Sequence, residues 1–580
     1  MYLKWCLLVS SLIIALVGKS QFDQSKLLKS NETPTYEEVV DFYEKYAQQH
    51  EDIALYNMGT SDYGLPIYLC VLNGEKDSTK TFLNARNGST ILINNGIHPG
   101  EPCGINASMQ LVIEFSNMPE IGKKNFPTVG IITGYNVGGM KNRGAYSRAN
   151  QDGPAEHGFR GNAQNLDLNR DFIKMDSENM WTFATIFHAL DPDVFIDTHT
   201  TNGADYQYAM TYIVPLYDRM PKSTRDLLFD NMLPYLKENM PKKWNYDITP
   251  YVSMNGKTLD EGIHAFNPLP RYAMGYADLF NALSFTTEAH MLKPFEDRVR
   301  STYAFLVETL AWMVNNGDEI EKARTAAFKE QLSEKKYPVD FSYNGTQDSI
   351  LFKGFEWTYK PSTLTEQERL FYDRDQPFER YIPHHFRYDA AREVDVPPYY
   401  VVGSQAKEVI AQLEANKVNF NRITSDTTIF VNNYRVVNFE SPTKPYEGHF
   451  LHSKVEIDQE QDSVRFKKGD ILIPTNQRHQ RFIVSVLDPR MEDSYFAWNF
   501  FDSYVQQKEY FSAYVFEETA EKLLVENPAL EKKFRAKQKE DVAFAENRWA
   551  QLYFLYKNSP YYEPSHNVLP VFGGVGEGRR

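Results

Sequence analysis

One short stretch constrains the fold of this 580-residue chain more than any other. The apolar run 91–94 has the composition and length of a buried strand, and it stops at Asn95-Gly96. The next polar side chains are His98 and Glu101, which lie three residues apart between two prolines and a glycine. Such a turn places an imidazole beside a carboxylate, and both are ligands that zinc accepts.

The His98 and Glu101 pair alone does not establish a metal site, because the chain has 13 histidines and polar turns contain similar pairs. His188 and Asp191, just before a proline, form such a pair and are typical of a helix end. A catalytic zinc takes three protein ligands and leaves a fourth position for water. A third ligand therefore has to come from another segment.

The pattern after residue 34 predicts alternating helices and strands. Thr35 is a fitting N-cap for an amphipathic helix, and short apolar runs typical of strands recur down to about residue 290. We therefore expect an α/β domain with a mixed, mostly parallel sheet flanked by helices, in which polar residues at strand ends share one edge. The strands and helix expected early in this domain cover 53–58, 66–72, 91–94, 102–115 (helix) and 129–135.

The length of the chain exceeds what one hydrophobic core usually supports, so we expect further domains. A helix from about 295 to 314 is expected to end at 315–318, and the last residues, 573–580, are expected to be loose. The expected divisions are a signal over 1–20, an N-terminal lead over 21–34, the α/β domain over 35–316, a helical connector over 317–336, and an accessory region over 337–580 that is β-rich and then helical.

Composition and the first residues predict an exported protein that does not bind nucleic acid. The net charge of −15 opposes binding to polyanions. Residues 1–20 combine Lys4 with an apolar segment too short to span a bilayer and small residues before the expected cut, which is typical of a cleaved secretory signal. A periplasmic or extracellular location without an integral membrane segment follows. Cys70 and Cys103 would remain, in a redox state that the sequence leaves open.

Three later segments carry further polar side chains of functional type. The loop 158–172 contains arginines and an asparagine, and guanidinium groups bind carboxylates in a bidentate manner. The run 193–199 reads as a buried strand that delivers His199, and the run 283–290 reads as a strand that delivers Glu288. Each of these signals is weak when it is taken separately.

Taken in order, these elements resemble the zinc metallocarboxypeptidases, the carboxypeptidase A-like peptidases, over about residues 35–315. The segment that reads R-x-N-x-x-x-x-D-L-N-R looks like the regulatory and bacterial branch of that family, here with a long C-terminal extension. Several elements matched in one order are more specific than any single motif. The matched elements are His98-x-x-Glu101, Arg160, Asn169-Arg170, His199 and Glu288.

The resemblance implies a role for each matched residue. His98, Glu101 and His199 would hold one zinc ion, and Asp167 would accept the other ring proton of His98. The remaining implied roles are general base for Glu288, oxyanion stabilisation for Arg160 and binding of the substrate's terminal carboxylate for Asn169 and Arg170, with Arg271 and either Tyr272 or Tyr276 as further substrate contacts.

The implied activity is hydrolysis of the last peptide bond of peptides that have a free C-terminus. One alternative is a zinc amidohydrolase that acts on cell-wall peptides or acylated amino acids with the same site chemistry. A second alternative, from another class, is a catalytically inactive peptidase-like binding protein. This second alternative predicts that a ligand or Glu288 is missing from the sequence, and none is.

Overall fold

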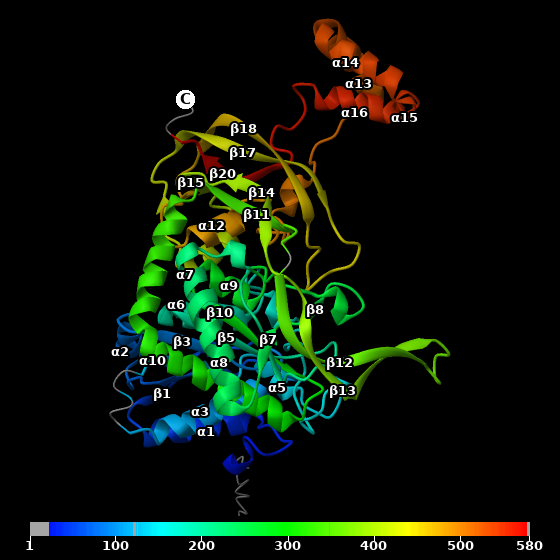
Figure 1. Ribbon diagram of the computed structural model, residues 1–580. Coiled ribbons are helices and arrows are strands. Elements are labelled where there is room, and N and C mark those ends of the chain that lie inside the picture. Colours follow the sequence, from blue (N-terminus) through cyan, green and yellow to red (C-terminus); the bar gives the residue numbers. More distant parts are fainter. Residues whose placement is uncertain (1–22, 120–122, 124–125, 347, 577–580) are drawn as a thin grey trace, which may run out of the picture.

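The computed structural model describes residues 23–119, 123, 126–346 and 348–576 (Figure 1). The predicted signal over 1–20 lies outside the described residues, so it stays a prediction. In the part of the chain that is described, no helix combines the length and apolar character needed to cross a membrane.

A mixed sheet forms the centre of the first half of the molecule, as the sequence predicts. Among the described residues it has eight strands in the order β1-β2-β4-β3-β5-β10-β6-β7. The central strands β4, β3, β5 and β10 run parallel to one another, whereas β1, β2 and β6 pair antiparallel with their neighbours toward the centre. The strands are β1 (Ile53–Thr60), β2 (Pro66–Leu72), β3 (Thr90–Asn94), β4 (Thr128–Ile132), β5 (Val194–Thr201), β6 (Met210–Ile213), β7 (Ile248–Pro250) and β10 (Leu283–His290).

Helices cover both faces of this sheet. Because successive strand residues point to opposite faces, Phe195 and Ile196 of β5 mark the two sides. Phe195 packs against Phe183 of α6, and Phe285, the β10 neighbour of Ile196 in the register, packs against Phe305 of α10. The helices of this half are α1 (Tyr36–Gln49), α2 (Ser78–Ala85), α3 (Cys103–Ser116), α5 (Val137–Lys141), α6 (Glu178–Leu190), α7 (Lys222–Asp226), α8 (Leu233–Trp244) and α9 (Ala273–Leu279).

Several local predictions are confirmed. Thr35 and Glu38 form a reciprocal capping box at the start of α1. His188 lies in the last turn of α6, as its sequence context predicts. Cys70 and Cys103 are both buried free thiols, which settles the state that the sequence left open.

The helix α10 runs without a break from Phe295 to Ser333, so the predicted end at 315–318 is wrong. The Asn-Asn-Gly-Asp signal produces only a kink, in which Asn316 leaves helical geometry at φ −127°. The helix continues because its second half is packed: Ile320 and Ala327 are fully buried. Tertiary packing therefore outweighs the local stop signal.

The second half of the chain is β-rich, as predicted, and it shares a sheet with the first half. Strands β8 (Ser253–Met254) and β9 (Ile263–His264) continue the sheet of β12 (Asp348–Pro361) and β13 (Glu368–His385). A further sheet has the order β16-β19-β15-β20-β17-β18. The remaining strands are β11 (Lys336–Tyr343), β14 (Tyr388–Asp395), β15 (Tyr399–Val402), β16 (Asn421–Arg422), β17 (Thr427–Glu440), β18 (Ser453–Phe466), β19 (Ile471–Pro474) and β20 (Val568–Gly574).

The strand β20 corrects the expectation of a loose end from residue 573. It lies between β15 and β17 and pairs antiparallel with both, through Gly573 and Gly574 among others. Residues 577–580 lie outside the described part of the chain. The last ordered segment is thus an inner strand of its sheet.

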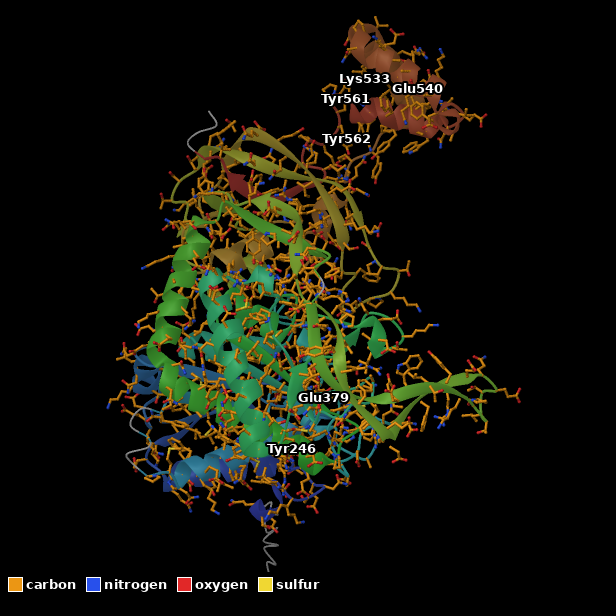
Figure 2. All side chains as sticks on the ribbon, viewed as in Figure 1. Tyr246, Glu379, Lys533, Glu540, Tyr561 and Tyr562 are labelled. Atoms are coloured by element: carbon orange, nitrogen blue, oxygen red, sulfur yellow. The ribbon has the colours of Figure 1, made fainter. Side chains whose placement is uncertain are left out.

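Four helices project from the body as a separate group (Figure 1, orange and red). Figure 2 shows Lys533 and Glu540 on this group, well away from the main body. The group has its own apolar core, which includes Phe534 and Phe544. Its helices are α13 (Ala513–Glu526), α14 (Pro528–Glu540), α15 (Val542–Ala545) and α16 (Arg548–Lys557), and the other helices of the second half are α11 (Lys407–Ala415) and α12 (Gln480–Leu487).

Candidate metal centre and active-site cavity

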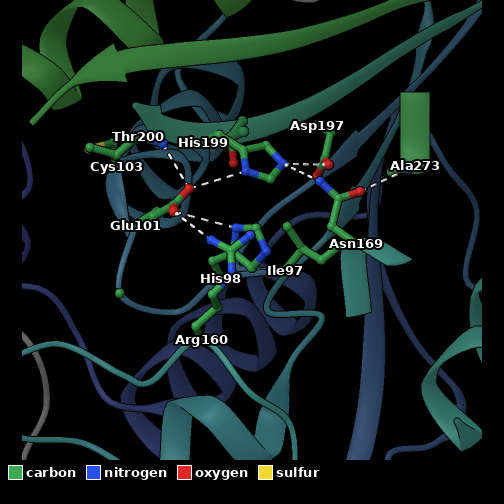
Figure 3. A network of polar contacts seen from close by, with 12 residues as sticks. Ile97, His98, Glu101, Cys103, Arg160, Asn169, Asp197, His199, Thr200 and Ala273 are labelled. Carbon is green, nitrogen blue, oxygen red and sulfur yellow. Dashed lines mark hydrogen bonds and ion pairs between the residues drawn. The ribbon is translucent and has the colours of Figure 1, made fainter. Parts of the chain in front are cut away.

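Three side chains with donor atoms converge at the edge of the sheet (Figure 3). His98 and Glu101 come from the turn after β3, and His199 comes from β5. One donor atom from each residue lies within 4.8 Å of the other two, and all three side chains are buried. The structure therefore brings together the residues that the sequence predicts as a ligand set.

Local structure explains why the turn after β3 points at β5. The chain leaves β3 through Gly96, whose φ of +68° lies in the left-handed region that suits glycine. The backbone N–H of Glu101 then donates to the carbonyl of His98 at 2.8 Å, which closes a tight turn. On the parallel neighbour, the side chain of Asn94 donates to Asp197 at 2.9 Å and fixes the two strand ends together.

Each imidazole is oriented by a carboxylate on its outer nitrogen. Nε2 of His98 lies 2.9 Å from Asp167, and Nε2 of His199 lies 2.6 Å from Asp197. Both Nδ1 atoms face Glu101, at 3.4 Å for His98 and 3.1 Å for His199. Carboxylates in this position fix the tautomer and ring orientation of histidines that bind metals.

The donor set fits a divalent cation. Nδ1 of His98 is buried and has no hydrogen-bond partner among the described residues. A buried polar atom without a partner is unfavourable, and a cation held between Nδ1 of His98, Nδ1 of His199 and the Glu101 carboxylate would remove that cost. Two imidazoles and one carboxylate match the ligand types of catalytic zinc sites.

Glu101 is held in its charged form. Burial favours the neutral acid, but the positive charge of Arg148 and the neighbouring His98 lower the pKa of Glu101 well below its usual range. Arg148 donates to Oε1 at 2.8 Å, and the backbone N–H of Thr200 donates to Oε2 at 2.9 Å. An ionised carboxylate is the form that binds a cation.

Glu288 faces the same cavity from the next strand. In the parallel pairing of β10 with β5, Glu288 lies opposite His199. Burial raises the pKa of Glu288 above its usual value, against the opposing effect of His199. A carboxylate with a raised affinity for protons, beside a candidate metal centre, is suited to proton transfer.

A cationic group occupies the opposite part of the cavity. Arg160 donates to Asp167 at 2.8 and 3.0 Å, and its Nη1 lies 3.6 Å from Glu101. The guanidinium of Arg170 lies over the ring of Tyr272, at 4.5 Å from its centroid. These contacts hold two guanidinium groups on one side of the candidate metal centre.

Asn169 connects this group to the ligands. Its side-chain carbonyl accepts from the backbone N–H of Ala273 at 2.9 Å, and its amide nitrogen lies 3.5 Å from Nε2 of His199 (Figure 3). The start of α9 therefore positions Asn169.

The cavity has a volume of about 430 Å³, enough for a small peptide end. Its wall joins polar residues of the metal centre and the guanidinium pair with an apolar side. The lining residues are His98, Glu101, Arg148, Arg160, Asn169, Arg170, His199, Thr200, Thr201, Asn202, Ile213, Tyr251, Phe266, Pro268, Tyr272, Met274, Thr286, Glu288 and Met291.

Two of the predicted substrate contacts lie outside this wall. Tyr276 is fully buried in the core, where its hydroxyl donates to Asn416 at 2.5 Å, so it is a packing residue and Tyr272 is the remaining candidate. Arg271 is ion-paired with Asp493 at 2.9 Å and lies over the ring of Trp498. It supports the contact with the second half of the chain instead of lining the cavity.

Sequence reasoning missed several residues of the site. Asp197 had a usable signal, because a residue two positions before His199 on a strand shares its face. Arg148 and Tyr251 lie in loops without a recognisable motif, so only the folded chain places them in the cavity.

Comparisons with known proteins match the fold of about half the chain. No family model matches the sequence, and no curated protein matches it. A metallo-carboxypeptidase from Burkholderia cenocepacia is 16% identical with a TM-score of 0.36, and the match covers 48% of this chain and 69% of that one. A metallo-carboxypeptidase from Pseudomonas aeruginosa is 14% identical (TM-score 0.35, 49% and 69% covered), and carboxypeptidase A from Helicoverpa armigera is 16% identical (0.36, 53% and 80%). Solved structures similar to this chain are thus metallo-carboxypeptidases.

Proposed function

We propose that this chain is a zinc-dependent carboxypeptidase that removes the C-terminal residue of peptides. One observation carries the proposal: two imidazoles, each oriented by its own carboxylate, converge with Glu101 in a cavity that also contains a carboxylate-binding pair of side chains. The set combines what is needed to hold a metal, to move a proton and to recognise a terminal carboxylate.

The residues His98, Glu101 and His199 would hold the ion. When bound, zinc acts as a Lewis acid and lowers the pKa of water at its open position. Glu288 accepts a proton from the attacking water on its carboxylate and delivers it to the nitrogen of the leaving amine. Its place opposite His199 in the strand register supports this role.

The arginines have separate roles in this proposal. Arg160 donates through Nη1 to the oxygen of the scissile carbonyl as negative charge develops there, since its other nitrogens are held by Asp167. Arg170 and Asn169 bind the terminal carboxylate of the substrate. A carboxylate fixed at one distance from the reacting centre allows only the last peptide bond to reach it.

The proposal also names a substrate class and a compartment. Peptides with a free C-terminus are the expected partners, and the N-terminal signal predicted from the sequence makes an exported location the expected one. The negative net charge of −15 supports the absence of nucleic-acid substrates.

The experiment measures metal content and peptide cleavage together. We expect purified protein to bind one zinc ion per chain and to release single C-terminal amino acids from a peptide mixture, while C-amidated copies of the same peptides stay intact. Preferential cleavage of peptides with D-residues or γ-linkages, or of acylated amino acids, would support the amidohydrolase instead. Stoichiometric zinc without hydrolysis of any of these substrates would support an inactive binding protein and contradict the proposal.

A further inference from the structure

A loop from the second half of the chain reaches the guanidinium group of the candidate active site. The hydroxyl oxygen of Tyr446 accepts a hydrogen bond from Nε of Arg170 at 2.8 Å, across 276 positions of sequence. The adjacent residue makes a second contact, since the carboxylate of Glu447 accepts from the backbone N–H of Asp167 at 2.7 Å. Two consecutive residues of one loop thus contact the segment that carries the predicted carboxylate-binding residues.

The backbone of this loop is strained at the contact. Residues 446–449 form a tight turn in which Tyr446 and His449 exchange both backbone hydrogen bonds, at 2.7 and 3.1 Å. The two central residues, Glu447 and Gly448, have φ of +49° and +84°. Asn or Asp with Gly is preferred in such turns, and a glutamate in the left-handed region is uncommon. Strain of this kind is typical of sites where the surrounding contacts require it.

The loop is fixed to the body on its other sides. His449 lies 2.9 Å from the carboxylate of Asp176. The ring of Tyr446 stacks on Trp498, with centroids 6.2 Å apart and an angle of 21°. The side chain of Asn499 exchanges two hydrogen bonds of 2.9 Å with the backbone of Phe450. A loop anchored in this way can hold a hydroxyl at a fixed position.

The contacts restrict how Arg170 can move. Its guanidinium lies over Tyr272, its Nη1 donates to the carbonyl of Asn169 at 2.8 Å, and its Nε donates to Tyr446. Among the described residues, Nη2 is the guanidinium nitrogen for which no hydrogen bond is found. Arginine loses considerable side-chain entropy when it is ordered, so a site that orders it before the ligand arrives binds a carboxylate more tightly.

We propose that Tyr446 is a positioning residue for carboxylate recognition: its hydroxyl and the Glu447 contact hold Arg170 and the 167–170 turn in the orientation that receives the substrate's terminal carboxylate. This inference rests on the proposed function. It makes the second half of the chain part of the substrate-binding machinery, although none of its residues lines the cavity.

The first test measures binding without turnover. Zinc-loaded Glu288→Gln protein is titrated with a short peptide as the free acid and as the C-terminal amide, with and without Tyr446→Phe. The phenylalanine keeps the ring on Trp498 and removes only the hydroxyl. We expect Tyr446→Phe to weaken binding of the acid by about 5- to 50-fold, the range for one hydrogen bond to a charged group, and to leave the amide unchanged.

The second test separates positioning of Arg170 from a general structural effect. In a double-mutant cycle, Tyr446→Phe should have no further effect in the Arg170→Ala background, because the group that it positions is gone. Glu447→Asn suits the turn better but cannot reach Asp167, and we expect it to raise KM for the free acid more than it lowers kcat. Tyr504→Phe is the matched control, since Tyr504 is bonded to Gln405 and packs against Phe501.

The outcomes distinguish this inference from the proposed function. Absence of hydrolysis by the wild-type protein would contradict the proposed function, while the binding titration would still test Tyr446. Equal weakening of acid and amide, an unchanged acid affinity in Tyr446→Phe, or the same loss with and without Arg170 would overturn the inference. A lack of preference for the acid in the protein that retains Tyr446 and Arg170 would overturn it as well.

Discussion

At the scale of single residues, Glu288 is the group whose loss should affect chemistry most and structure least. We predict that Glu288→Gln keeps the fold and the bound zinc but lowers kcat by about 10²- to 10⁴-fold, because the amide cannot accept a proton from water. The measurement is kcat on a peptide with a free C-terminus, together with zinc content. Glu296→Gln on α10, where the carboxylate pairs with Arg300 at the surface, is the matched control. Retained turnover in Glu288→Gln would remove this residue from the mechanism.

Asp197 gives a second prediction at this scale, because it orients His199 without facing the metal position itself. Replacement by Asn leaves a side chain of the same size but removes the negative charge that fixes the ring. We predict that Asp197→Asn weakens zinc binding by about 10- to 100-fold. Competition with a chromophoric chelator measures the affinity, and Asp340→Asn, whose carboxylate pairs with Arg392, is the control. An unchanged zinc affinity would show that strand geometry alone orients His199.

At the scale of elements, the second half of α10 is held to the sheet by one buried cation. Arg324 is 7% exposed and pairs with Asp193 at 2.5 Å and with Asp191 at 3.0 Å. We predict that Arg324→Met lowers the free energy of unfolding by about 3 kcal/mol, because it leaves two carboxylates without their partner. Urea unfolding followed by tryptophan fluorescence measures this.

A matched change on the same helix tests the cause of that loss. Arg300 pairs with Glu296, and both side chains are 40% exposed. We expect Arg300→Met to cost less than about 1 kcal/mol, as exposed ion pairs do. Similar losses in the two variants would mean that burial of the Arg324 pair is not what fixes α10.

The elements also show which parts of the fold the sequence could predict. Strands that are buried on both faces read as continuous apolar runs, so β3, β5 and β10 were placed correctly, and with them the positions of His98, His199 and Glu288 at one edge. The continuation of α10 past Asn316 was not predicted, since its cause is burial against segments that are distant in the sequence. Local patterns report local preferences only.

The candidate site divides in the same way. Its ligands and general base follow strand ends and could be predicted from motif order. The contact of Tyr446 with Arg170 joins residues 276 positions apart through a turn that carries no motif, so no reading of the chain in order could find it. The resemblance to carboxypeptidases ends near residue 315, and the roles of later residues are visible only in the folded molecule.

At the scale of the whole molecule, the projecting helices and the strand that follows them should differ in importance. The chain leaves the body near Tyr504 and returns near Asn567, where the backbone N–H of Asn567 donates to the carbonyl of Tyr504 at 2.9 Å. The backbone N–H of Lys508 also donates to Glu563 at 2.6 Å, so the two ends of the excursion lie side by side. A loop whose ends are close can be shortened at little entropic cost.

We predict that replacing residues 509–562 by a short Gly-Ser linker leaves zinc binding and peptide hydrolysis within about twofold of the full chain, because the removed helices pack mainly on their own core. Truncation after residue 567 is the contrasting variant. It removes β20 from between β15 and β17, exposes two unpaired strand edges and should abolish soluble, zinc-binding protein. Zinc content and kcat/KM are measured for both. Loss of hydrolysis in the linker variant, with zinc retained, would mean that the projecting helices take part in substrate binding.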